Sequence, residues 1–331
     1  MIRACYALAA LRLLFLLAAW PFFDNVDEQH HVDMIVKVAR GHLPRGLERY
    51  DAESTRLIAR AETWEVFGTP GPDRPPPAWR AVDGGRYEAT RRAWWEAAPN
   101  IESTGPPVPY LLGAAWRRVG GLLGLDDVGS LYWLRLLNVP VYLGAMAAAV
   151  RFATLAYPGD PALPASVAVL LAVFPQDLYY GVNADVPAIL FGTLALLGLW
   201  RMHRRGCRSP GEALASGLLL AAALLTKASN VAVLAPLAFV ASSRLRAGGR
   251  KEAARIVMLV GAAALPVAGW LFRNAVVGGD VMGTAAKVAA LGWTAKPVGA
   301  WLDHPLFTVH GALAFAGGLA ATAWRGEFFW H

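Results

Sequence analysis

Acidic and imidazole side chains follow the first apolar segment of the sequence, in the stretch FFDNVDEQHH at residues 22–31. If this stretch is helical, Asp27, Glu28 and His31 share one face, because residues three and four apart are neighbours on a helix. A carboxylate there could act as a general base or bind a metal, and a low local dielectric would raise its pKa. Taken alone, the stretch fits the capped, acidic start of an amphipathic helix somewhat better.

Further polar side chains stand at the ends of apolar segments. Asn183 and Asp185 precede one segment, and Glu102 precedes a Gly-Pro-Pro turn into another. Lys227 lies between two apolar runs, and Arg273 ends a third. Charge at membrane depth is costly, so Lys227 and Arg273 either bind an anion such as phosphate or only extend towards water. For Asp185 the alternative is a plain helix cap.

The composition is that of a membrane protein with several spans. Of 331 residues, 56% are hydrophobic and only 17% are charged, below the soluble average of about 25%. The net charge of +7 does not indicate nucleic-acid binding, because the basic residues sit mostly in short clusters between apolar runs. Two cysteines cannot build a disulfide framework or a Cys-rich metal site. Walker, Rossmann and HExxH patterns are absent, which argues against a soluble nucleotide-binding fold.

Apolar runs predict an all-α, polytopic membrane helix bundle of about eight or nine segments. The first run is read as a retained membrane helix, because no clean cleavage site follows it. The segments are expected at residues 5–23, 131–156, 162–182, 185–201, 211–226, 229–243 and 253–272, with two shorter ones at 106–119 and 306–324.

Basic loops predict the orientation of these segments. The loops Arg201–Arg208 and Arg244–Lys251 should be cytoplasmic by the positive-inside rule. Asp185, Lys227 and Arg273 then fall together on the extracytoplasmic side. The protein is therefore expected to be integral to the inner or plasma membrane, with a candidate site facing outwards.

The segment 106–119 is too short to cross a bilayer and is expected to be half-inserted. Before it lies a polar insert, residues 24–105, whose apolar residues recur at helical spacing around Val32–Ala39 and Leu57–Trp64. The insert is predicted to form amphipathic helices on the bilayer surface, anchored by Tyr87, Trp94 and Trp95, with a loop at 70–77. The whole chain is expected to form a single transmembrane domain with this external insert.

An ordered set of short motifs resembles the GT-C superfamily of integral-membrane glycosyltransferases, which includes protein O-mannosyltransferases and the lipid A aminoarabinose transferase. Each motif is weak alone, but their order and spacing cover most of the chain. They are VDEQHHVDMIVKVARGHLP, PPVPYLLGAAW, LRLLNVPVYLGAM, FPQDLYYGVNADVPAI, GLLLAAALLTKASN and WLFRNAVVGGDVMG. Family members are commonly longer, so the C-terminal part of the family is expected to be missing here.

The resemblance implies transfer of a sugar from a polyprenyl-phosphate donor to a lipid, glycan or protein acceptor, with inversion in one displacement. It assigns catalytic roles to Asp27, with its neighbour Glu28, and to Asp185. It assigns the donor phosphate to Lys227 and Arg273, since a leaving phosphate needs cationic stabilisation. The other cavity candidates are His31, Glu102 and Asn183. Some relatives bind a divalent metal near the acids and others need none, so the metal is left open.

Two other functions remain open from the sequence. A transporter or flippase for lipid-linked sugars would use a similar cavity without making a bond, although it predicts inverted repeats, and none is evident. A noncatalytic membrane subunit is the third possibility.

Overall fold

The computed structural model describes residues 1–23, 27–61, 84–174, 177–294 and 296–325. Within these ranges the fold is helical apart from one short antiparallel pair, β1 (Glu48–Arg49) with β2 (Pro99–Asn100). The expected all-α class is confirmed. Trp64, the loop at 70–77 and the side chain of Tyr87 lie outside the described residues.

Five helical stretches among the described residues are long and apolar enough to cross a membrane. Two of the expected segments are shorter: α8 (Ala162–Val173) and α10 (Pro210–Leu224) would extend only about 18 and 22 Å, against a hydrocarbon core of about 30 Å. Membrane character is thus supported, while a total of eight or nine spans stays a prediction. The five stretches are α1 (Ile2–Ala19), α6 (Asp127–Leu136) joined to α7 (Asn138–Ala156), α9 (Asp185–Arg205), η4 (Ala228–Val233) joined to α11 (Leu234–Ala247), and α12 (Arg250–Gly278).

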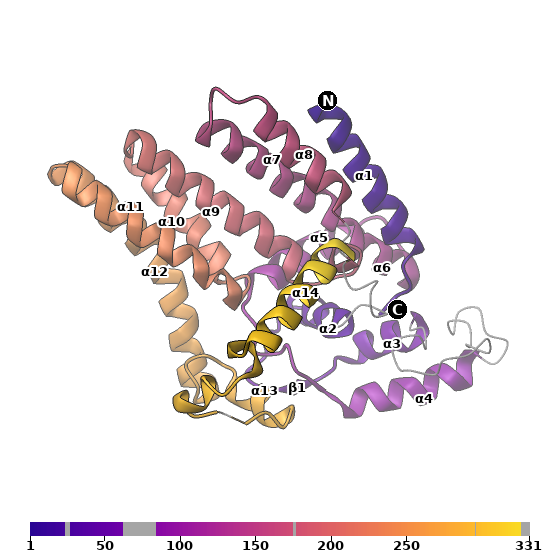
Figure 1. Cartoon of the computed structure of the whole chain (residues 1–331). Coiled ribbons are helices and arrows are strands. Elements are labelled where there is room, and N and C mark those ends of the chain that lie inside the picture. Colours follow the sequence, from indigo (N-terminus) through magenta and orange to yellow (C-terminus); the bar gives the residue numbers. More distant parts are fainter. Residues whose placement is uncertain (24–26, 62–83, 175–176, 295, 326–331) are drawn as a thin grey trace.

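The long helices pack in two groups, seen in Figure 1 as α1, α7 and α8 on one side and α9 to α12 on the other. Each group has its own apolar core, and contacts between α7 and α9 join them. Small residues allow the closest approach: a Cβ at Gly217 of α10 would overlap the carbonyl oxygen of Leu259 in α12.

A third unit lies at the end of the bundle away from the N-terminus (Figure 1). It contains α2 (Glu28–Ala39), α3 (Ala52–Ala61), α4 (Gly84–Ala97) and α5 (Val108–Gly121), with α6 packed against it. Its core includes Ile35, Ile58, Trp95, Tyr110 and Leu134. The insert therefore shares a core with α5 and α6.

The position of α2 differs from the expected amphipathic surface helix. Residues His31 to Val38 are all buried, including the charged Asp33 and Lys37. A helix buried on most faces cannot rest on a bilayer with one face in water, because its polar side chains need partners inside the protein. Lys37 finds them in Asp33, at 2.7 Å, and in the carbonyl oxygen of Arg49, at 2.6 Å.

The C-terminal part is made of short elements and one longer helix. They are α13 (Ala285–Ala290), η5 (Val298–Trp301), η6 (Pro305–Phe307) and α14 (Val309–Arg325). The turn after α8 contains η3 (Asp177–Tyr179), so the segment expected at 162–182 is a helix only as far as Val173.

Candidate functional site

A cavity of about 810 Å³ lies where the α2–α5 unit meets the ends of α9, α10 and α12. It gathers six of the eight side chains that the sequence singled out, from segments more than 150 residues apart. These six are Asp27, His31, Glu102, Asn183, Asp185 and Lys227. The polar wall also contains Tyr110 and Lys287, which the sequence did not single out.

Asp27 precedes α2 with a left-handed backbone, φ 70° and ψ −1°. Its carboxylate is 39% exposed and lies 3.8 Å from the Nε2 atom of His30. Burial raises the pKa of Asp27, and the charge of Glu102 adds to that effect against the opposing influence of His31 and two lysines. A carboxylate with a raised pKa that faces a cavity is suited to accept a proton.

Lys227 and Asp185 form an ion pair across the cavity wall. Asp185 is the first residue of α9, and Lys227 immediately precedes η4. Asn183 fixes the start of α9, because its side-chain oxygen accepts hydrogen bonds from the N–H groups of Asp185 (2.8 Å) and Val186 (3.3 Å). Both charged side chains are partly exposed, at 41% and 38%, so an anionic ligand can compete for the ammonium group.

Glu102 and Lys287 make a second ion pair on the same cavity. Burial acts to raise the pKa of Glu102, but His31 and Lys287 outweigh it, and the pKa is lowered. Tyr110 connects His31 with Glu102. Its hydroxyl group lies 3.1 Å from Nδ1 of His31 and donates a hydrogen bond to the carboxylate of Glu102 at 3.5 Å. Burial lowers the pKa of His31, against the opposing charges of Glu102 and Asp27.

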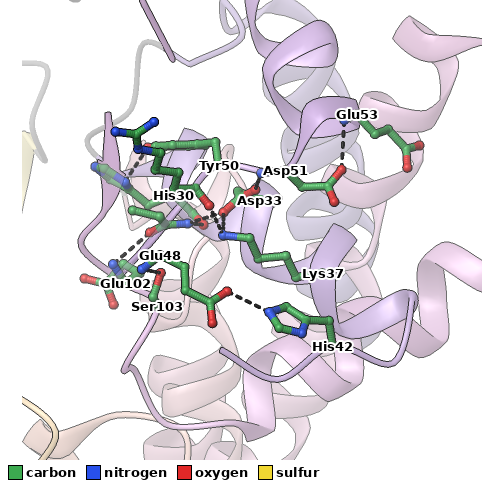
Figure 2. Close-up of polar contacts among 12 residues, drawn as sticks. His30, Asp33, Lys37, His42, Glu48, Tyr50, Asp51, Glu53, Glu102 and Ser103 are labelled. Carbon is green, nitrogen blue, oxygen red and sulfur yellow. Dashed lines mark hydrogen bonds and ion pairs between the residues drawn. The ribbon is translucent and has the colours of Figure 1, made fainter. Parts of the chain in front are cut away.

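A buried polar network behind the cavity positions Glu102 (Figure 2). Asn100 donates to Asp33 at 2.7 Å and to the carbonyl oxygen of His30 at 2.9 Å. Its side-chain oxygen accepts from the backbone N–H of Glu102 at 2.8 Å. Tyr50 lies 2.5 Å from Nδ1 of His30 and adds a second contact to the same helix start. The network joins the β1–β2 pair to α2, and through the Asn100 side chain it holds the backbone of Glu102 beside the cavity.

Glu28 does not reach the cavity. Its carboxylate binds the guanidinium of Arg135, at 2.6 and 2.8 Å, and accepts from the N–H groups of Phe23 and Val182, both at 2.9 Å. Arg135 also donates to backbone carbonyls at the end of α1, including that of Trp20 at 2.6 Å. All acceptor positions of Glu28 are therefore used to join α1, α2, α6 and the turn before α9.

Arg273 also lies outside the cavity lining. Its guanidinium donates to the carbonyl oxygen of Pro44 and stacks 4.8 Å from the ring of Trp270. Trp270 does line the cavity, so Arg273 reaches it only through this ring. Of the two cations expected at a phosphate, the structure brings Lys227 to the cavity and pairs Arg273 with backbone.

Another part of the cavity lining is apolar. Its side chains come from α10, η4, α11 and α12 and are Leu224, Leu225, Val231, Leu234, Val267 and Leu271. An apolar wall beside charged groups can accept a ligand that has a hydrocarbon part and a charged head.

Among the residues that the structure describes, no three His, Cys, Asp or Glu side chains are grouped to hold a metal ion. The donor set of the cavity therefore does not fit a divalent metal by itself, since two of its carboxylates are paired with lysines. The sequence does not point to Lys287, because 185 residues separate it from Glu102 and no motif surrounds it. In comparisons with family models, curated proteins and solved structures, no match to this chain was found.

Proposed function

We propose that the protein transfers a sugar from a polyprenyl-phosphate donor to an acceptor hydroxyl, in a single inverting displacement on the extracytoplasmic membrane face. The observation that carries the proposal is the meeting of Asp27 with the Asp185–Lys227 pair on one cavity of about 810 Å³. A general base and a phosphate-binding cation are the two groups that such a reaction requires.

In the proposed step, the acceptor oxygen attacks the anomeric carbon while the bond from that carbon to the phosphate oxygen breaks. The hydroxyl proton passes to Asp27, and the polyprenyl phosphate leaves with the bonding electron pair. Lys227 binds the phosphate and stabilises the charge that develops on it, with Lys287 as a second cation. Asp185 orients Lys227 before the donor arrives. The apolar wall formed by α10 to α12 takes the first isoprene units.

The direct test is transfer by the purified protein in lipid nanodiscs, using a panel of radiolabelled polyprenyl-phosphate hexoses and pentoses. We expect release of polyprenyl phosphate and a loss of about 10²- to 10⁴-fold in Asp27→Asn. Asp303→Asn is the matched control, because Asp303 is exposed and does not line the cavity. Equal rates in Asp27→Asn and the native protein would remove Asp27 from the reaction.

The same panel separates transfer from transport. Sealed vesicles that accumulate the donor on the opposite side without releasing polyprenyl phosphate would replace the proposal with a flippase. A protein that binds none of the donors and moves none of them would instead be a noncatalytic subunit.

A further inference from the structure

A second, smaller hollow lies at the other end of α9, about 30 Å along the helix from Asp185. Its volume is about 170 Å³. Its walls come from the last turns of α7 and α9, which pack against each other. The lining residues are Arg151, Leu155, Trp200, Arg201, Arg204 and Arg205.

The charge of this hollow is largely uncompensated. Within the part of the chain that the structure describes, Arg151, Arg201 and Arg204 make no ion pair, whereas Arg205 is paired with Glu212 at 2.8 Å. No carboxylate of the described ranges lines the hollow. Three guanidinium side chains that line one hollow without an acid favour an anion, and the planar guanidinium binds phosphate oxygens in pairs.

Trp200 adds an aromatic ring to the wall of the hollow. The Nε1 N–H group of its ring is buried and has no hydrogen-bond partner among the described residues. Arg204 lies over the same ring at 5.9 Å, so the indole and the guanidinium lie at one site.

The position of the hollow at the ends of two candidate membrane spans indicates the source of the anion. The candidate spans that contain α7 and α9 end at Ala156 and Arg205, so the hollow would lie at the boundary between hydrocarbon and water when these spans cross a bilayer. Trp and Arg at this level are placed to meet phospholipid headgroups. A volume of about six water molecules suits a phosphate group, and Leu155 offers an apolar contact beside it.

We propose that this hollow, formed by the ends of α7 and α9, binds the phosphate of an anionic phospholipid headgroup from the adjacent leaflet. The simpler explanation is a set of solvated arginines that only sets the orientation of the helices. That explanation predicts the same lipid preference for any two arginines removed from this end of the bundle.

The test compares two double variants with equal charge change in dioleoylphosphatidylglycerol and dioleoylphosphatidylcholine nanodiscs. The variant Arg151→Gln/Arg204→Gln removes two guanidinium groups from the hollow. The control variant Arg246→Gln/Arg250→Gln removes two exposed arginines that do not line it. Native mass spectrometry after partial delipidation should show phosphatidylglycerol retained by the native protein and the control. Retention should fall at least about tenfold in the first variant, whose melting temperature in detergent should stay unchanged.

Two results would overturn the proposal. Equal retention of phosphatidylglycerol by both double variants would show bulk electrostatics without a site. Displacement of the lipid by millimolar inorganic phosphate would assign the hollow to a free anion. The same conclusion would follow if inorganic phosphate raised the melting temperature as much as phosphatidylglycerol does. Because the readout is lipid retention, the outcome is independent of sugar transfer.

Discussion

The Lys227 ammonium group is paired with the Asp185 carboxylate across 42 residues of sequence, at the mouth of a cavity that Asp27 also lines. The pair joins the beginning of α9 to the turn between α10 and η4. It keeps the cation at the surface of the cavity while no anion is bound. Substitutions of Lys227 and of Asp185 should therefore have opposite effects on anion binding.

Substitutions at the pair should change the affinity for polyprenyl phosphate in opposite directions. Lys227→Gln should weaken binding by about tenfold or more, because a charge-assisted bond to phosphate contributes about 1.5–3 kcal/mol. Asp185→Asn should tighten it, since the ammonium no longer has a competing carboxylate. Titration in nanodiscs measures both, with Lys251→Gln as the exposed-lysine control. Unchanged affinity in both variants would contradict a phosphate at Lys227.

The pH dependence of transfer should carry the signature of Asp27. A general base acts when deprotonated, so kcat/KM should rise with pH through the pKa of Asp27, which burial raises above its ordinary value of 3.8. The acidic limb of the profile should accordingly lie above that value in the native protein. Asp27→Asn should lose this limb along with most of the rate. A residual rate with the same acidic limb would show that another group titrates.

Glu28 and Arg135 should matter for stability and not as reacting groups. Both side chains are almost fully buried, and removal of one partner leaves a buried charge that costs about 3–5 kcal/mol. Glu28→Gln should therefore lower the melting temperature strongly. Arg92→Gln breaks an exposed pair, Arg92 with Glu96 at 2.8 Å, and should change stability by less than about 1 kcal/mol. A Glu28→Gln protein that melts normally but fails in transfer would assign Glu28 to the chemistry.

Close packing of α10 on α12 gives a test of the fold. Gly217→Ala should destabilise the protein by about 1–3 kcal/mol, because the new Cβ would overlap the Leu259 carbonyl oxygen and the helices must separate. Gly261→Ala, in α12, meets open space and should be neutral or stabilising by up to about 1 kcal/mol. Thermal melts of both variants in one detergent compare them. Equal melting temperatures would mean that α10 and α12 are farther apart than described.

The sequence by itself predicted the all-α class and the end of the bundle at which Asp27, Asp185 and Lys227 gather. A long apolar run predicts a membrane helix from its own residues, without information about the rest of the fold. The loops between successive runs alternate from one end of a bundle to the other. For that reason α9 and α10 agree with the expected segments within four residues at each end, whereas α12 extends six residues beyond the expected end. The predicted helical spacing at Val32–Ala39 was also correct, although the surface location was not.

Only the tertiary structure decided which neighbours of these residues face the cavity. Asp27 and Glu28 are adjacent, yet one lines the cavity and the other binds Arg135, 107 residues away. Lys287 joins the cavity lining through its ion pair with Glu102, and Arg273 donates a hydrogen bond to the carbonyl oxygen of Pro44. The physical reason is that a buried charge must find its partner in space. Spacing along one chain shows which side chains share a helix face, but a partner on another element is set by how the helices pack.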